Sequence, residues 1–200
     1  MRLEKRARIL ILTGNSLCHN PRALKEAEAL ADEGHQVDVL GSGANQAYRL
    51  RDEKLAAEKK WKFIGLGNDA GRLERNIYRA QRYLGNQAHR WVGWENFWQL
   101  GPMAELLLKE GRKRKADLYI AHSEAGMWAA EQLRKDGQRV GVDMEDWFSE
   151  DLLPEARRDR PIRLLKELKK TCFAMGCTAR APPRRWRMRW WRPTAAGDQQ

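Results

Sequence analysis

The sequence predicts an α/β fold in which helices cover both faces of a parallel β-sheet. Three observations lead to this prediction. Short apolar runs alternate with amphipathic stretches, residues typical of helix starts and stops separate them, and polar clusters follow two of the apolar runs. With 200 residues, of which 42% are hydrophobic, the chain is long enough for one domain, or one and a half, with a core.

The first third of the chain contains three predicted strands and one predicted helix. Arg8–Thr13 (RILILT) is apolar throughout, as a buried strand requires. The helix Pro21–Glu33 follows Asn20, a favourable N-cap, and Gly34 ends it. Pro21 suits the first helical position because its missing N–H is not needed there. Two more strands are predicted, Gln36–Gly41 and Trp61–Leu66.

The remaining elements continue the alternation. Residues 72–110 are expected to be helical for most of their length, with a break near Gly101 and Pro102. Within them Trp91, Trp94 and Trp98 are spaced three and four apart, which is typical of a helix face that packs in the core. The series closes with the strand Ala116–Ala121, the helix Glu124–Lys135, the strand Arg139–Val142 and a helix over Pro161–Lys170. Residues 1–170 are therefore predicted to form one domain.

Residues 171–200 differ in character from this domain. They show neither helical nor strand periodicity and pair tryptophan with arginine, as in RRWRMRWWR. Two interpretations stay open. The segment is either a genuine Arg/Trp-rich binding tail or the product of a frameshift in GC-rich coding DNA. In the frame that starts at the third codon base, Trp or Met codons followed by CGN arginine codons become alanine codons, so the frameshift is the preferred interpretation.

Composition argues against a secreted, a membrane-spanning or a disulfide-rich protein. The first apolar run is too short for a signal peptide, and nothing approaches the roughly 20 apolar residues of a membrane span. Cys18, Cys172 and Cys177 form no disulfide framework and have no metal-ligand spacing, which favours a reduced, cytoplasmic setting.

The net charge of +11 is concentrated in two segments, 72–115 and 180–200. A row of arginines in the first segment is typical of a solvated helix face, but on a peripheral enzyme it would rest on the anionic inner face of a membrane. Nucleic acid is the less favoured partner. The row consists of Arg72, Arg75, Arg79 and Arg82.

Polar side chains follow two predicted strands where each strand ends. His122 and Glu124 follow the strand Ala116–Ala121, and Asp143, Glu145 and Asp146 follow Arg139–Val142. Ligands of open parallel sheets bind beyond the carboxyl ends of the strands. An imidazole there can act as a base or orient a hydroxyl, and nearby carboxylates favour that interpretation over a merely structural histidine. Helix capping by Asp143 or Asp146 stays open. Because no His or Cys has metal-ligand spacing, hydroxyl binding is preferred to a metal.

The loop between the first strand and the first helix is a second candidate ligand site. A helix N-terminus offers free N–H groups and a positive dipole end, which suit a phosphate or carboxylate. Gly14 would let the backbone approach a ligand, Asn15 lies beside it, and Arg22 would add charge; Asn20 belongs to the same loop as the helix cap. The loop has one glycine where a dinucleotide fingerprint needs three, so nicotinamide binding is not favoured.

The order of these motifs resembles the N-terminal half of GT-B glycosyltransferases of family 4. The matching stretches are an N-P-R helix start, E-A-x-A-L-A-x-x-G-H-x-V-x-V from Glu26, D-L-Y-I-A-H from Asp117 and V-D-M-E-D-W-F-S-E from Val142. The resemblance covers Arg8 to about Lys170. It implies a Rossmann-like domain, one half of a GT-B fold, that binds a sugar or lipid-linked acceptor.

The resemblance also implies roles for individual residues. His122 matches the family's histidine beside the donor sugar and is the expected catalytic residue. Gly14 and Asn15 match a loop that approaches phosphate and acceptor, while Asp143, Glu145 and Asp146 fall on the family's D-x-H-E turn, where this chain has Glu and Asp in place of His and Glu. Such enzymes retain anomeric configuration, use a nucleotide-sugar donor, and need neither a metal nor a tightly bound cofactor.

No donor-binding half with its E-x7-E motif follows in this sequence. The expectation is therefore a truncated or frameshifted acceptor half that is inactive alone. Two rival interpretations remain. One is a stand-alone α/β protein whose basic tail binds nucleic acid or an anionic membrane, and the other is a different enzyme on a flavodoxin-like sheet.

Overall fold

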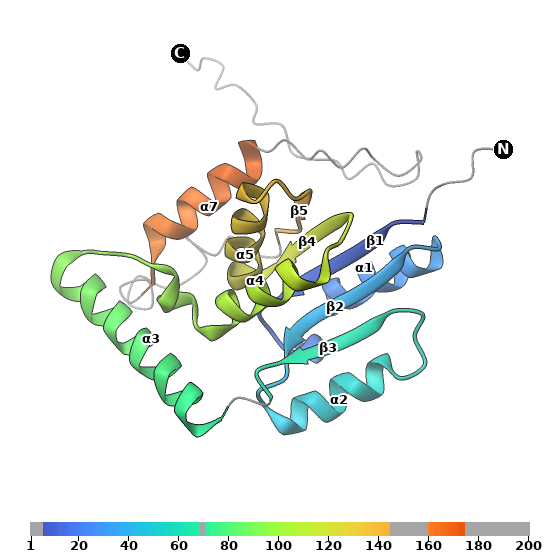
Figure 1. Ribbon diagram of the computed structural model, residues 1–200, viewed down its shortest axis with the longest axis horizontal. Coiled ribbons are helices and arrows are strands. Elements are labelled where there is room, and N and C mark those ends of the chain that lie inside the picture. The colour runs from blue at the N-terminus through green and yellow to red at the C-terminus, as the bar shows by residue number, and fades with distance from the viewer. Residues whose placement is uncertain (1–5, 69–70, 145–159, 175–200) are drawn as a thin grey trace, which may run out of the picture.

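The computed structural model describes residues 6–68, 71–144 and 160–174. Five parallel strands form one sheet with the order β3-β2-β1-β4-β5, shown in Figure 1. The strands are β1 (Arg8–Thr13), β2 (Gln36–Ser42), β3 (Lys62–Leu66), β4 (Leu118–His122) and β5 (Val140–Val142).

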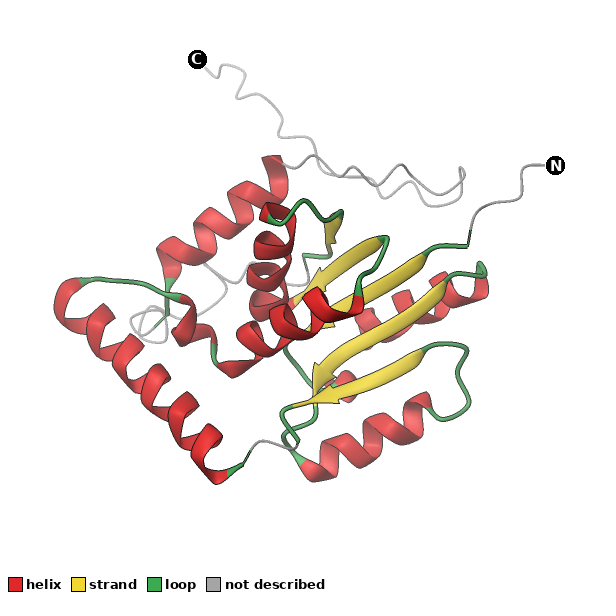
Figure 2. Ribbon diagram, in the orientation of Figure 1, coloured by secondary structure: helices red, strands yellow, loops and turns green. Residues whose placement is uncertain are grey.

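Helices lie on both faces of this sheet, as Figure 2 shows in red and yellow. One face is covered by α1 (Pro21–Asp32) and α2 (Gln46–Ala56), the other by α4 (Pro102–Arg114) and α5 (Ser123–Lys135). α7 (Ile162–Ala174) packs on α5, and α3 (Arg72–Val92) contacts the short 3-10 helix η2 (Phe97–Leu100). A second 3-10 helix, η1 (Leu17–His19), precedes α1. The predicted α/β, Rossmann-like fold is confirmed.

Each face of the sheet has its own apolar core, as expected for strands buried on both sides. Alternate side chains of β1 divide between the two cores: Leu10 and Leu12 pack against α4 and α5, whereas Ile9 and Ile11 pack against α1. Tyr119 is buried in the first core, and its hydroxyl donates to the carbonyl of Gly111 at 3.2 Å.

α5 approaches β1 unusually closely because residue 126 is glycine. A Cβ atom at Gly126 would lie 2.5 Å from the carbonyl oxygen of Leu12, well inside van der Waals contact. Gly14 is under the same constraint, since a Cβ there would lie 2.9 Å from Cβ of Ala125 and 2.9 Å from Oγ of Ser123. These two glycines let the start of α5 rest directly on the end of β1.

The strand order reverses direction at β1: the chain first adds strands on one side of β1 and then on the other. The boundary between β1 and β4 is therefore the topological switch point of the sheet. β2 and β3 lie on one side of β1, and β4 and β5 on the other. The register pairs Thr13 with His122, so these two strands end side by side. In open α/β sheets a crevice at such a boundary is where ligands bind.

The observed elements differ from the sequence predictions at several points. Helix α2 was not predicted. His122 is the last residue of β4, where the predicted strand ended at Ala121. α7 extends to Ala174, past the predicted boundary at Lys170, and the Arg/Trp-rich segment over 175–200 lies outside the described residues.

The predicted helix over 72–110 is interrupted earlier than expected. α3 ends at Val92 because Gly93 adopts a left-handed conformation (φ 66°), and α4 begins only at Pro102. The prediction that Trp91 and Trp94 pack in the core is therefore wrong, since the two side chains are not on one helix and are 83% and 56% exposed. Among the described helices, none is long and apolar enough to cross a bilayer.

Candidate functional site

The loops that follow β1 and β4 are joined at the switch point. The backbone N–H of Gly14 donates to Oγ of Ser123 at 2.8 Å. Ser123, the first residue of α5, has a φ of 65°, in the left-handed region that side chains other than glycine rarely adopt. Such backbone strain is found most often at functional sites, where the surrounding structure maintains it.

His122 lies beneath this junction and is completely buried. Its Nε2 is 2.6 Å from Oε2 of Glu26, a residue on α1. A hydrogen bond to an ionised carboxylate requires the His122 tautomer with its proton on Nε2, because a carboxylate only accepts; the Nε2–H group then donates to Glu26. The ring of His122 is thereby fixed in position, with Nδ1 directed towards Asp143, whose Oδ2 is 3.8 Å away.

Asp143 follows β5 and forms a two-point ion pair with Arg22, on the first turn of α1. Nε of Arg22 donates to Oδ2 of Asp143 at 3.0 Å, and Nη2 donates to Oδ1 at 2.6 Å. The Arg22 side chain is 52% exposed and that of Asp143 is 19% exposed. This pair therefore provides a solvent-facing donor and acceptor set over the buried imidazole of His122.

Glu124, the second residue of α5, pairs with a basic side chain. It forms an ion pair with Arg160, which lies just before α7. Burial lowers the pKa of the Arg160 guanidinium from its ordinary value, and the positive charge of Arg82 lowers this pKa further. In this conformation the Glu124 carboxylate is partnered within the protein.

Asn20 has a structural role in the described conformation. Its Oδ1 accepts from the backbone N–H of Ala23 at 3.0 Å, and its Nδ2 donates to Oγ1 of Thr13 at 3.1 Å. The side chain is buried. The predicted helix cap is confirmed, and both ends of the amide are occupied by protein atoms, so Asn20 orients the loop between β1 and α1.

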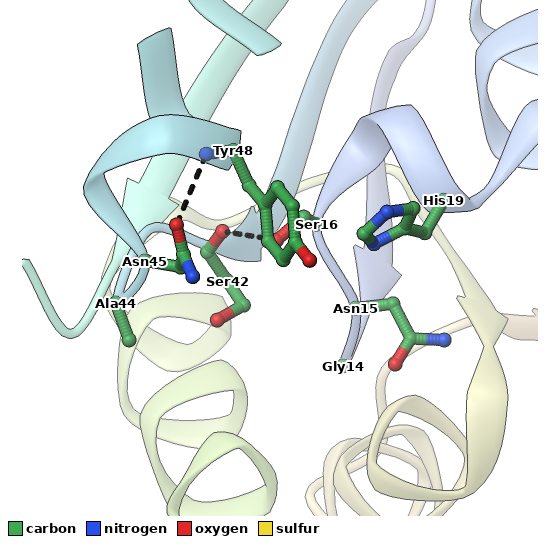
Figure 3. A pocket seen from close by; sticks show the side chains of 8 residues that line it. All are labelled: Gly14, Asn15, Ser16, His19, Ser42, Ala44, Asn45 and Tyr48. Atoms are coloured by element: carbon green, nitrogen blue, oxygen red, sulfur yellow. Dashed lines mark hydrogen bonds between the residues drawn. The ribbon is translucent and has the colours of Figure 1, made fainter. Parts of the chain in front are cut away.

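Gly14 and Asn15 border an open hollow beyond the ends of β1 and β2, which Figure 3 shows from close by. Its volume is about 450 Å³. The rings of His19 and Tyr48 meet edge to face, with their centroids 4.4 Å apart. The other lining residues are Ser16, Ser42, Ala44 and Asn45. Aromatic faces beside hydroxyl and amide groups suit a sugar or a nucleoside.

The loop that borders this hollow is anchored from α2 by a buried carboxylate. Asp52 accepts from the backbone N–H groups of Leu17 at 2.9 Å and of Cys18 at 2.7 Å, and it is completely inaccessible to solvent. Burial raises the pKa of the Cys18 thiol above its ordinary value of 9.0. The hydrogen bond to Asp52 and the charge of Asp52 raise this pKa further, while the charge of Arg51 opposes the shift.

The structure thus brings Gly14, Arg22, His122 and Asp143 together at one end of the sheet. Glu145 and Asp146 lie outside the described residues. Sequence reasoning did not select Glu26 or Ser123 as site residues, although Glu26 is one helical turn after Arg22 and therefore on the same face of α1. Asp52 and Tyr48 were also missed, because helix α2 itself was not predicted.

No part of the described chain brings together three or more His, Cys, Asp or Glu side chains that could hold a metal ion. The donor groups that are present, a two-point Arg–Asp pair and the Tyr48 hydroxyl, are suited to hydroxyl, phosphate or carboxylate groups of a ligand.

Comparisons with known proteins gave matches in structure only. No family model matches the sequence, and no curated protein sequence matches it. Among solved structures, the chain is similar to the glycotransferase of kitacinnamycin, with 13% identity and a TM-score of 0.43 over 84% of this chain and 36% of that one. It is also similar to glycosyltransferase VinC in complex with DTDP, with 17% identity and a TM-score of 0.43 over 84% of this chain and 44% of that one. The chain spans less than half the length of either protein.

Proposed function

We propose that this chain is the acceptor-binding half of a retaining, nucleotide-sugar-dependent glycosyltransferase similar to family 4. In the complete enzyme a second domain would hold the donor, and the sugar would pass to a glycan or a lipid-linked acceptor. The chain alone would bind acceptor and would not catalyse transfer. The order of motifs from Arg8 to about Lys170 supports this proposal.

The observation that carries the proposal is the charged group at the switch point. Arg22 and Asp143 face solvent over the buried His122 and its partner Glu26, and all four meet at the carboxyl edge of the sheet. A sugar hydroxyl both donates and accepts hydrogen bonds, and Asp143 and Arg22 offer one acceptor and one donor side by side. Asp143 would accept from the attacking hydroxyl of the acceptor.

His122 is proposed to act through Asp143. The His122 side chain has no exposed surface, so it cannot touch a ligand in this conformation. That His122 is a catalytic residue stays a prediction. Its ring, fixed by Glu26, places Nδ1 next to the Asp143 carboxylate. In this position the buried ring would limit the positions that the Asp143 carboxylate, which receives the acceptor hydroxyl, can take.

Ligand-observed NMR on the full chain tests the proposal. The probes are a panel of monosaccharides and a short-chain polyprenyl phosphate in detergent. Wild-type protein should give saturation-transfer signals for at least one probe, and Asp143→Asn should lose them. Asp136→Asn is the matched control, because Asp136 pairs with Arg112 in the same two-point manner away from the site. Equal signals from both variants would contradict the assignment of Asp143.

A separate experiment tests whether the complete enzyme has a donor-binding half. The coding DNA is sequenced from the Lys166 codon through a few hundred bases past the stop codon. A continuing frame with a second Rossmann pattern and an E-x7-E motif is the expected result. If no frame continues, the Arg/Trp-rich tail is genuine and a stand-alone binding protein becomes the better interpretation.

A further inference from the structure

Helix α3 has two exposed faces of opposite character. It is 21 residues long and lies beyond the carboxyl ends of β2 and β3, away from the two cores (Figure 1). Within α3 only Gly85 is buried, where it packs against Asn96 and the Cβ atom of Trp98. The rest of the α3 surface borders solvent or is half-buried.

One exposed face of α3 is apolar. With successive residues about 100° apart around the helix, four large side chains fall within an arc of about 40°. Their exposed fractions are far above those of ordinary apolar side chains on a folded domain. They are Leu73 at 75%, Ile77 at 48%, Leu84 at 56% and Trp91 at 83%. Val92, the last residue of α3, and Trp94, just beyond the helix, are also exposed, at 77% and 56%.

The opposite face of α3 is basic. Five arginines lie within an arc of about 80° on the far side of the helix from the apolar residues. They are Arg72, Arg75, Arg79, Arg82 and Arg90. Against them α3 has one acidic residue, Glu74, so the helix has a net charge of +4.

We propose that α3 is a membrane-docking helix that lies in the interface of an anionic lipid bilayer. A strongly amphipathic helix with arginines on its polar face and tryptophan and leucine on the other is the pattern of interfacial helices. Leu73, Ile77 and Leu84 would enter the boundary of the acyl chains, and Trp91 and Trp94 would lie at headgroup depth, where indole rings are favoured.

A second copy of the chain is a poorer occupant of this surface. Two α3 helices packed through their apolar faces would leave the arginine rows on the two outer sides, about two helix diameters apart, so the basic face would contribute nothing to the contact. An anionic lipid surface instead attracts this charge.

Docking through α3 would place the candidate site close to the bilayer. α3 lies at the same end of the sheet as the carboxyl ends of the strands (Figure 1). The positive charge of Arg82 on α3 also lowers the pKa of Arg160, the partner of Glu124. A lipid-linked acceptor would then reach the site without leaving the membrane. The docking surface itself does not depend on the transfer reaction proposed above, since it is argued from α3 alone.

Vesicle co-sedimentation of the full chain tests this proposal. The vesicles contain phosphatidylcholine alone or with about one-third phosphatidylglycerol, which supplies the negative surface. Leu73→Ser with Leu84→Ser removes apolar surface from α3. Leu50→Ser with Leu55→Ser is the matched control, because these leucines are also exposed but lie on α2. The C-terminal Arg/Trp-rich segment is the same in every variant, so differences report on α3.

The wild-type chain should bind the anionic vesicles, and the α3 pair should weaken partitioning about tenfold, whereas the α2 pair should leave it nearly unchanged. Replacing Arg72 and Arg79 with Gln should weaken binding more than replacing Lys54 and Lys109 with Gln. Equal binding by the α3 and α2 pairs, or no binding by the wild type, would overturn the proposal. The proposal would also be overturned if light scattering showed that the wild type is a dimer and that the α3 pair is a monomer, while both bind vesicles equally.

Discussion

Glu26 and His122 are 96 residues apart in the sequence, and Oε2 of Glu26 lies 2.6 Å from Nε2 of His122. One residue is on α1 and the other ends β4, so the contact joins the two sides of the switch point. The imidazole is completely buried, whereas the Glu26 side chain is 26% exposed. The carboxylate therefore reaches inward to satisfy a buried donor.

Replacing Glu26 with alanine should lower the free energy of unfolding. The change removes the acceptor of a buried imidazole N–H, and such losses typically cost about 1–3 kcal/mol. Glu28→Ala is the matched control on the same helix, because Glu28 pairs with a partly exposed Lys59 and should cost less than about 1 kcal/mol. Urea denaturation followed by circular dichroism measures both values. Equal losses would show that the contact with His122 contributes little.

Replacing Arg22 with glutamine should separate stability from ligand binding. Because the Arg22 side chain is 52% exposed, solvent screens its ion pair, and the free energy of unfolding should fall by less than about 1 kcal/mol. Binding of the sugar and polyprenyl phosphate probes should nevertheless be lost. Arg112→Gln breaks a similar exposed pair with Asp136 and should leave binding intact. Retained binding in Arg22→Gln would remove Arg22 from the site.

Replacing Gly126 with alanine should destabilise the domain through steric overlap. The new methyl group would lie 2.5 Å from the Leu12 carbonyl oxygen, and the backbone of α5 would have to move away from β1. Overpacking of this kind costs about 1–3 kcal/mol. Gly141→Ala is the control, because its Cβ would have no neighbour nearer than Tyr119 O at 4.0 Å. Thermal unfolding compares the two, and an unshifted melting temperature for Gly126→Ala would refute the close packing of α5 on β1.

The thiol of Cys18 should respond in opposite directions to two substitutions. The pKa of Cys18 is raised by burial first and then by Asp52, so Asp52→Asn should lower this pKa and increase the thiolate fraction at a given pH. Arg51 lowers the same pKa, so Arg51→Gln should raise it. Below the thiol pKa, alkylation by iodoacetamide should therefore be faster in Asp52→Asn and slower in Arg51→Gln, as followed on the Cys18 peptide by mass spectrometry. Changes in the same direction would indicate a general opening of the loop.

The fold could be predicted because its strands have strong local patterns. The apolar run Arg8–Thr13 has the bounds that β1 has, and Asn20 with Pro21 marks the start of α1. Helix α2 was missed because Tyr48, Leu50 and Leu55 are exposed and Asp52 is its buried residue, so the helix has no apolar stripe. Asp52 is buried because it accepts hydrogen bonds from the backbone of η1. Local sequence does not reveal such a contact between distant segments.

The candidate site could be predicted only in part. His122 and Asp143 follow apolar strands, a pattern that local sequence shows. Glu26 contacts His122 because α1 packs against the sheet next to β4. This packing depends on the whole fold and cannot be seen in the local sequence. The core prediction for Trp91 was wrong because Gly93 ends the helix by a left-handed turn, after which the three-and-four spacing no longer describes a single face.

The hydrogen bond from Gly14 to Ser123 has a thermodynamic consequence for any ligand that binds at this end of the sheet. It ties the loop after β1 to the first residue of α5, and the contact of Gly126 with β1 leaves little room for either to move. The two segments are thus ordered during folding rather than during binding. A ligand that binds at this edge of the sheet meets a preorganised surface, and the conformational entropy that association would otherwise remove has already been lost.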